Sequence, residues 1–283
     1  MKTRVITAIV GLVVLALVLL MFNTTIFNLV IAAVTLIAVC EVYHAMGMGK
    51  KEWPLLAVWV PLTLGVMLPQ AWPLVLPMAY LLVAFVCIYL VIRNGTVSYQ
   101  KAAGLVMFGG IIVLCFFSLV YLKHLLPVAE YKYDAVFFIL LILCFAWGGD
   151  TCAYFAGRAF GKHKLCPKVS PKKTVEGAVG GVLGTMVFGV VATLIYAYAA
   201  ARVEYFTQTN IGVSMYFIVA LLGMVAAVLG IYGDLFASVV KRQVGLKDYG
   251  DIFPGHGGIL DRFDSVLFIA PFVTMVVTMV FYR

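Results

Sequence analysis

The sequence predicts an all-α polytopic membrane protein with about nine transmembrane helices. Of its 283 residues, 64% are hydrophobic and only 11% are charged, whereas a soluble domain is about half apolar and about a quarter charged. The apolar residues also gather in runs of about 20, the length that crosses a bilayer as a helix. We therefore expect a single integrated membrane domain, in which residues 1–133 form scaffold helices and residues 134–283 carry the chemistry.

Nine apolar runs are the candidate spans, and prolines interrupt the third and fourth of them. These two runs could instead form a re-entrant pair, because non-helical backbone at membrane depth is tolerated where protein buries it. The first run follows Lys2 and Arg4 as in a signal peptide, but no small-x-small cleavage site follows it, so we expect a retained span. The runs are 5–22, 26–43, 54–71, 73–92, 103–122, 135–156, 177–200, 212–238 and 264–282.

Positive charge in this chain indicates orientation rather than a nucleic-acid partner. The net charge is +8, but the sequence has no soluble basic domain and no aromatic residues interleaved with its charges. With a cytoplasmic N-terminus, all lysines and arginines except Lys123, Lys132, Arg202 and Arg283 face inward, as the positive-inside rule requires. We therefore expect the polar loops and the active site at the cytoplasmic membrane face, where nucleotides and anionic headgroups are available.

Three carboxylates lie beside the last two runs, where charge is costly and usually marks function. Asp234, Ser238 and Lys241 are spaced i, i+4 and i+7, so they share one face of the eighth helix. The alternative is a structural ion pair between Asp234 and Lys241. Asp261 and Asp264 follow at i and i+3, and helix capping explains one of them but not both.

A bound cation would account for these carboxylates together. Three carboxylates at one membrane face would repel one another unless a cation joined them. Carboxylate oxygens with room for water and phosphate suit Mg²⁺. The residue types therefore predict a magnesium site formed by Asp234, Asp261 and Asp264.

A glycine-rich loop with Lys247 and Asp248 connects these two helices. Gly257 and Gly258 would let backbone approach a ligand closely, and their N–H groups could bind phosphate. A lone histidine in a loop is more often structural or solvated, so His256 has two interpretations, a structural residue or a contact to substrate.

A second polar cluster begins at Asp150, which lies within an apolar run and needs a partner there. The loop from Arg158 to Lys173 then contributes many cations, which could bind anionic lipid or clamp a polyphosphate. Glycines at both ends of the loop and the hydroxyls of Ser170 and Thr174 favour the clamp.

Other residues predict structure rather than chemistry. The glycines from Gly177 to Gly184 form overlapping GxxxG spacings, which let helices pack closely. Four residues near span ends are expected to be interfacial: His44, His124, Glu41 and Glu52.

Together the polar groups suit a reaction between a highly charged phosphate compound and a lipid. Nucleotidyl transfer needs mainly in-line positioning and neutralisation of charge. A phosphate monoester nucleophile has a second pKa of about 6 and needs no strong base. The sequence offers no obvious nucleophile–base pair, which favours direct transfer without a covalent enzyme intermediate.

Two motifs resemble the signature of the phosphatidate cytidylyltransferases, or CDP-diacylglycerol synthases. The first is Ser238-x-x-Lys241-Arg242-x₄-Lys247-Asp248-x-Gly250-x₃-Pro254-Gly255-His256-Gly257-Gly258-x-x-Asp261-Arg262-x-Asp264. The second is Asp150-x₃-Tyr154-x₂-Gly157-Arg158-x₂-Gly161-Lys162-His163-Lys164, followed by Ser170-Pro171-Lys172-Lys173-Thr174-x-Glu176-Gly177. Length and span count also fit bacterial members. One departure is Val175, where the family often has an aromatic residue.

The resemblance implies that the protein catalyses a step of phospholipid biosynthesis, in which CTP and phosphatidic acid react to give CDP-diacylglycerol and diphosphate. It implies Mg²⁺ ligation by Asp234 and Asp261, with Asp264 supporting them or binding a second cation. Lys241 completes the expected catalytic residues. A homodimer in a bacterial inner membrane is implied as well. The residues expected to bind substrate are Asp150, Arg158, Lys162, Ser170, Lys173, Thr174, Ser238, Arg242, Lys247, Asp248, His256, Gly257, Gly258 and Arg262.

Two alternative functions remain. One is a related CTP-dependent transferase or lipid kinase with another lipid acceptor. The other is a cation-coupled transporter with Asp150 and Asp234 as ion ligands, against which the lack of internal repeats argues.

Overall fold

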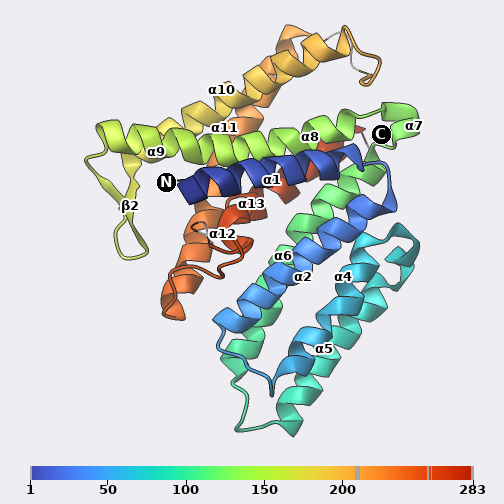
Figure 1. The fold of residues 1–283 in the computed structure, drawn as a ribbon, viewed down its shortest axis with the longest axis vertical. Helices are drawn as coiled ribbons and strands as arrows, with labels where there is room; N and C mark the ends of the chain where they lie inside the picture. The colour runs from blue at the N-terminus through green and yellow to red at the C-terminus, as the bar shows by residue number, and fades with distance from the viewer. Residues whose placement is uncertain (1, 208–210, 254, 256, 282–283) are drawn as a thin grey trace. The chain divides into compact units, whose positions relative to one another are not determined.

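Every apolar run of the sequence forms helix in the computed structural model, which describes residues 2–207, 211–253, 255 and 257–281 (Figure 1). Among these residues, six helical segments are long and apolar enough to cross a membrane. Shorter apolar helices occupy the other three predicted spans, at Ile9–Leu20, Trp53–Met67 and Val266–Phe281. The prediction of a helical polytopic membrane protein is confirmed, whereas the count of nine spans and the cytoplasmic N-terminus stay predictions. The six long segments are Thr25–Ala45, Pro69–Ile92, Tyr99–Leu125, Asp134–Phe160, Val175–Ala200 and Val213–Gln243.

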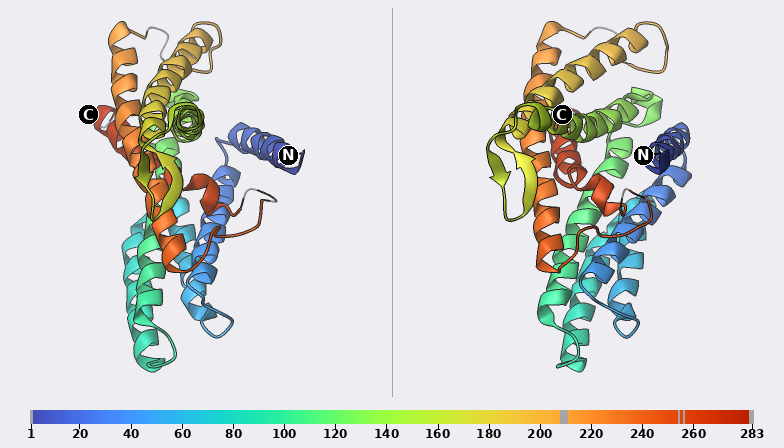
Figure 2. Two further views of the ribbon diagram at one scale, coloured as in Figure 1. Left: turned by 90° about the vertical axis from the view of Figure 1, so that its left-hand side faces the viewer. Right: turned by 60° about the vertical axis from the view of Figure 1, so that its left-hand side comes forward.

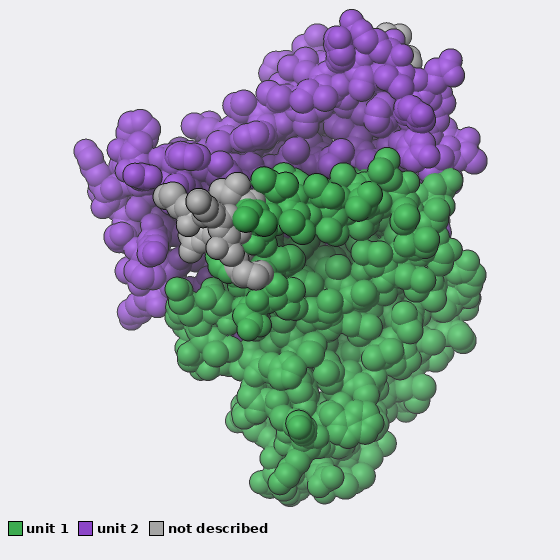
Figure 3. Space-filling view, in the orientation of Figure 1, with its two compact units in different colours: residues 1–120, 241–263 green, residues 121–240, 264–283 purple. Residues whose placement is uncertain are grey.

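The chain divides into two compact units, which Figure 3 shows in green and purple. Unit 1 consists of Met1–Val120 and Lys241–Phe263, and unit 2 consists of Tyr121–Val240 and Asp264–Arg283. The polar segment 241–263 therefore belongs to the unit of the N-terminal helices. As a result, the chemistry predicted for residues 134–283 is divided between the two units.

Unit 1 is built around the packing of α2, α4 and α6. Asn28 of α2 donates from Nδ2 to the Met67 carbonyl oxygen of α4 at 2.8 Å. Trp59 of α4 is buried against α6, where a Cβ on Gly109 would lie 2.6 Å from the indole ring. The elements of unit 1 are α1 (Lys2–Leu20), α2 (Thr25–Ala45), α3 (Trp53–Ala57), α4 (Trp59–Met67), η1 (Pro69–Leu74), α5 (Val75–Ile92), α6 (Tyr99–Leu125, which runs on into unit 2) and α12 (Leu260–Phe263).

The proline-rich region is helical but segmented. Pro54 and Pro69 stand in the first turns of α3 and of the 3-10 helix η1, where the missing N–H has no intrahelical partner to lose. Leu68 is extended, with φ −109° and ψ 111°, as a residue before proline prefers. The third and fourth predicted runs therefore form two helical segments, α3–α4 and η1–α5, which pack against each other.

Unit 2 contains a long helix with a π-helical turn at its centre. This helix comprises α8, the π turn η2 and α9, and Asp150 lies in the first turn of α9. Such π turns are frequent at functional sites. The elements of unit 2 are α7 (Val128–Tyr131), α8 (Asp134–Leu143), η2 (Cys144–Gly148), α9 (Gly149–Phe160), β1 (Lys164–Cys166), β2 (Ser170–Thr174), α10 (Val175–Ala200), α11 (Val213–Gln243, whose end belongs to unit 1) and α13 (Val266–Phe281).

The glycines of α10 pack against α9, as their spacing predicts. A Cβ on Gly177 would lie 2.8 Å from the Ala153 carbonyl oxygen. A Cβ on Gly181 would lie 3.0 Å from Ala153 Cβ and 3.2 Å from the Gly149 carbonyl oxygen. Larger side chains would force these two helices apart, so the prediction of close packing is confirmed.

A short β-hairpin between α9 and α10 departs from the all-α prediction (Figure 2). β1 and β2 are antiparallel, with Lys164 opposite Thr174 and Cys166 opposite Ser170. The His163 carbonyl oxygen also accepts the Val175 N–H at 2.9 Å. Strands of three and five residues leave no apolar run in the sequence, so hydropathy alone does not reveal them.

Candidate active site

A buried ion pair joins the end of α11 to α12 within unit 1. The Lys241 ammonium donates to Oδ1 of Asp261 at 2.8 Å, and the two side chains are only 10% and 3% exposed. The centre of the Tyr249 ring lies 5.2 Å from Lys241 Nζ. Removing two charges from water is expensive, so such a pair persists only with good geometry and further hydrogen bonds.

Those further bonds come from the glycine-rich loop. Oδ2 of Asp261 accepts the N–H of Tyr249 at 2.7 Å and the N–H of Gly258 at 3.0 Å. Gly257 has φ +85°, and a Cβ there would lie 2.7 Å from the same oxygen. The Gly258 N–H, a predicted phosphate donor, is thus bonded to Asp261. His256 lies outside the described residues.

Asp234 pairs with Lys173 of the hairpin and not with Lys241, the partner that its helix spacing suggested. Its Oδ2 lies 2.5 Å from Lys173 Nζ of β2, and its Oδ1 accepts the Ser238 hydroxyl at 3.3 Å. Because Lys241 binds Asp261 instead, the suggested Asp234–Lys241 ion pair is wrong. The side chains of Lys173 and Asp234 are 26% and 22% exposed, so water reaches this pair. The hairpin carries Lys173 to the carboxylate.

Asp150 finds its partner in Ser265, the residue after Asp264. Ser265 donates its hydroxyl to Asp150 Oδ2 at 3.1 Å and its N–H to Asp264 Oδ1 at 2.9 Å. Helix α11 approaches the same turn, since a Cβ on Gly233 would lie 2.6 Å from the Asp264 carbonyl oxygen. Within unit 2, Asp150 and Asp264 therefore both contact Ser265, and Gly233, the neighbour of Asp234, packs against the backbone of Asp264. The prediction of a partner for Asp150 is confirmed.

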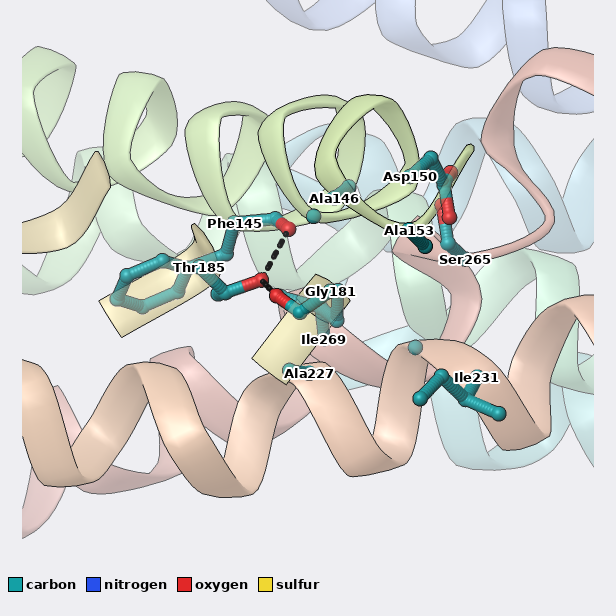
Figure 4. Close-up of a pocket in the computed structure, with 12 residues that line it drawn as sticks. Phe145, Ala146, Asp150, Ala153, Gly181, Thr185, Ala227, Ile231, Ser265 and Ile269 are labelled. Atoms are coloured by element: carbon teal, nitrogen blue, oxygen red, sulfur yellow. Dashed lines mark hydrogen bonds between the residues drawn. The ribbon is translucent and has the colours of Figure 1, made fainter. Parts of the chain in front are cut away.

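A small recess opens next to Asp150 (Figure 4). The π turn, α9, α10, α11 and α13 line it, mostly with small or apolar side chains and with the Thr185 hydroxyl. Thr185 donates to the Gly181 carbonyl oxygen at 2.8 Å. The space open to the centre of a water molecule is about 20 Å³, room for a water or two. This recess is too small for a nucleotide or an acyl chain.

Thr174, an expected substrate contact, and Glu176 of the second motif both make structural hydrogen bonds at the start of α10. Thr174 is the N-cap of α10, and its hydroxyl oxygen accepts the Gly177 N–H at 3.1 Å. Glu176 accepts the N–H of Lys162 at 3.0 Å and that of His163 at 3.2 Å, and its Oε1 lies 2.6 Å from His163 Nδ1. These bonds tie the hairpin to the start of α10.

The other predicted substrate contacts lie toward the surface. Arg242 donates from Nη1 to the Leu246 carbonyl oxygen at 3.0 Å, and Ser170 is half-buried at the start of β2. The remaining charged positions are exposed: Arg158, Lys162, Lys247, Asp248 and Arg262. Their contacts with substrate stay predictions.

The predicted magnesium ligands are divided between the units, Asp261 in unit 1 and both Asp234 and Asp264 in unit 2. Among the described residues, no group of three or more Asp, Glu, His or Cys side chains is arranged to hold an ion. The donor chemistry nevertheless suits Mg²⁺, which prefers carboxylate oxygens. The bonds described above occupy three of about four lone-pair sites on Asp261 and two on Asp234. The magnesium site stays a prediction.

Glu41 is the residue that sequence reasoning missed. We expected it at the membrane interface, but it is buried and accepts the N–H of Ile259 at 2.8 Å and the N–H of Leu260 at 2.9 Å. A glutamate near the end of an apolar run was a signal that a buried partner was needed. The partner itself, more than 200 residues away, left no mark in the local sequence.

Comparison with known proteins identifies the family to which this chain belongs. Residues 2–280 match the model of the cytidylyltransferase family, so the chain belongs to this family. It is 31% identical to a phosphatidate cytidylyltransferase of Staphylococcus haemolyticus (strain JCSC1435) over 281 residues, which cover 97% of this chain and 98% of the relative. It is 32% identical to a phosphatidate cytidylyltransferase of Staphylococcus aureus (strain COL) over 283 residues, with the same two coverages.

Another relative matches a shorter stretch of the chain. A phosphatidate cytidylyltransferase of Aquifex aeolicus (strain VF5) is 39% identical over 159 residues, 56% of this chain and 52% of the relative. The resemblance predicted from the two motifs is thereby confirmed.

Proposed function

We propose that this chain is a phosphatidate cytidylyltransferase, which joins CTP and phosphatidic acid to give CDP-diacylglycerol and diphosphate. The observation that carries the proposal is similarity to proteins of that name over 97% of the chain. The paired acidic and basic groups of the two motifs support it, because nucleotidyl transfer depends mainly on positioned charge.

The reaction proceeds by direct in-line transfer. A phosphate oxygen of phosphatidic acid forms a bond to the α-phosphorus of CTP, and the bond from that phosphorus to the bridging oxygen breaks. The electron pair leaves with diphosphate. A phosphate monoester with a second pKa of about 6 is already largely deprotonated at neutral pH, so no side chain has to remove a proton.

Carboxylates and lysines of the chain divide the work of binding. Asp234, Asp261 and Asp264 would hold Mg²⁺, an assignment that rests on their residue types and on the family. When bound, Mg²⁺ neutralises phosphate oxygens and stabilises the departing diphosphate. Lys241 and Lys173 lie 2.8 Å and 2.5 Å from their carboxylates, so each holds a positive charge beside a proposed ligand.

The exposed cations bind the anionic substrates. Arg158 and Lys162 precede the hairpin, and Arg242, Lys247 and Arg262 lie in the 241–263 segment. A group of fixed positive charges raises the local concentration of a polyanion such as CTP. We further propose a homodimer in the bacterial inner membrane with these loops in the cytoplasm, as the distribution of lysine and arginine favours.

The proposal is tested by diphosphate release from purified protein in mixed micelles. The protein is supplied with CTP, Mg²⁺ and a panel of lipids comprising phosphatidic acid, diacylglycerol and a polyprenyl phosphate. We expect diphosphate release with phosphatidic acid and with no other lipid of the panel. The Asp261→Asn variant should release no diphosphate. Release with only another acceptor would replace the proposed substrate. Ion-dependent flux through the protein in liposomes, with no diphosphate release, would favour the transporter.

A further inference from the structure

Glu41 binds, with both of its oxygens, the backbone of the glycine-rich loop between α11 and α12, called the motif loop below. It lies in the last turns of α2, is 6% exposed, and belongs to unit 1 together with the loop. Oε1 accepts the Ile259 N–H at 2.8 Å, and Oε2 accepts the Leu260 N–H at 2.9 Å. Hydrogen bonds to an ionised acceptor are about twice as strong as neutral ones, so this carboxylate holds two consecutive peptide groups.

Two glycines of the motif make room for this carboxylate. A Cβ on Gly258 would lie 2.6 Å from the carboxyl carbon of Glu41. A Cβ on Gly250 would lie 2.8 Å from Glu41 Oε1 and 3.3 Å from Gly258 Cα. These glycines therefore serve the approach of Glu41 to the loop, a role distinct from binding phosphate.

Asp261 holds the same turn from its other end. It accepts the N–H of Gly258 at 3.0 Å and that of Tyr249 at 2.7 Å, while its other oxygen binds Lys241. The N–H groups of three successive residues, 258 to 260, are thus divided between two buried carboxylates. If Glu41 released the N–H groups of Ile259 and Leu260, the turn that sets the position of the Asp261 carboxylate would lose these two hydrogen bonds to α2.

We propose that Glu41 is a positioning residue for the reaction, which fixes Asp261 and Lys241 through the backbone of residues 258–260. It acts without touching substrate, and the proposal rests on the proposed cytidylyltransferase function. Displacements of about 1 Å in a catalytic group lower turnover by about a hundredfold. Loosening this turn therefore lowers kcat, while substrate binding by the exposed cations is largely preserved.

The test compares Glu41→Gln and Glu41→Ala with a matched control, Asp134→Asn. Asp134 is also a buried carboxylate, and it accepts the Thr207 N–H at 3.1 Å and the Tyr196 hydroxyl at 2.7 Å. It belongs to unit 2 and has no part in the motif loop. Four quantities are measured for each variant: kcat, KM, hydrogen–deuterium exchange of peptides covering 249–261, and the thermal midpoint in detergent.

Glu41→Gln keeps the shape of the side chain but loses the charge and one acceptor. Because hydrogen bonds to a charged acceptor are about twice as strong as neutral ones, we expect kcat to fall about tenfold to a hundredfold and KM for CTP to change less than about threefold. Exchange in 249–261 should be about tenfold faster, and faster still in Glu41→Ala. Asp134→Asn should lower the thermal midpoint, with kcat within about twofold of the parent.

The outcomes separate this proposal from the proposed function. Parent-like kcat and exchange in Glu41→Gln would overturn the positioning role. A loss of kcat that only follows the fall in thermal midpoint, as a general loss of folded protein would produce, would overturn it too. If the parent protein itself transferred no cytidylyl group, the proposed function would fail, whereas exchange in 249–261 would still report whether Glu41 holds the turn.

Discussion

The buried Lys241–Asp261 pair should be strongly coupled in stability, and a double-mutant cycle measures this coupling. The changes are Lys241→Met, Asp261→Asn and both together. The two side chains are 10% and 3% exposed with the charged atoms 2.8 Å apart. Breaking a buried pair by removing one partner costs about 3–5 kcal/mol, because it leaves an uncompensated buried charge.

The cost of each single variant depends on the partners that remain for the other side chain of the pair. Without Lys241, Asp261 still accepts two backbone N–H groups, so we expect a cost of about 3 kcal/mol. Without the carboxylate, Lys241 keeps the Tyr249 ring at 5.2 Å, a weaker partner, so we expect about 5 kcal/mol. The double variant removes both charges and should cost at least about 2 kcal/mol less than the sum of the single variants.

The assay is reversible unfolding in mixed micelles, followed by the fluorescence of the four tryptophans. The partly exposed Lys173–Asp234 pair is the control, with side chains 26% and 22% exposed. Fully exposed pairs contribute about 0–1 kcal/mol and water weakens the attraction, so the cycle Lys173→Met with Asp234→Asn should show less coupling than the buried pair. Additive single effects at Lys241 and Asp261, or equal coupling in the two cycles, would refute the reasoning from burial.

Three further predictions follow from close contacts and from the proposed metal. Gly258→Ala pushes a Cβ against Glu41 and should destabilise the protein by about 1–3 kcal/mol and lower turnover; Gly110→Ala, where a Cβ meets no other described atom within 4 Å, should have neither effect in the unfolding and turnover assays. Gly181→Leu should lower the thermal midpoint by several degrees because it separates α9 from α10, and an unchanged midpoint would contradict this packing. Chelation with EDTA should abolish diphosphate release and added Mg²⁺ should restore it, whereas full activity in EDTA would remove the metal from the mechanism.

Local sequence was enough to predict the helices and to single out Asp150 as a residue that needs a partner. The apolar runs fall on helices because length and hydropathy alone decide what crosses a bilayer. Prolines predicted that the third and fourth runs are interrupted, and the helices do break at Leu68. The glycine spacing around Gly181 predicted close packing. Each of these features depends on residues within one or two turns of each other.

Long-range partners could not be predicted in the same way. Helix spacing suggested a pair between Asp234 and Lys241, but the hairpin brings Lys173 to Asp234, and the loop brings Asp261 to Lys241. The hairpin is too short to show in an apolar pattern. Glu41 was read as an interfacial residue because its partners lie more than 200 residues further along the chain.

The central claim is that the chain transfers the cytidylyl group of CTP to phosphatidic acid. It is tested most directly by supplying CTP labelled at the α-phosphorus or at the γ-phosphorus and following the label into the lipid. We predict that only the α label enters the lipid, one label for each diphosphate released. Transfer of the γ label to the lipid would identify a lipid kinase, and no transfer of either label by folded protein would contradict the claim altogether.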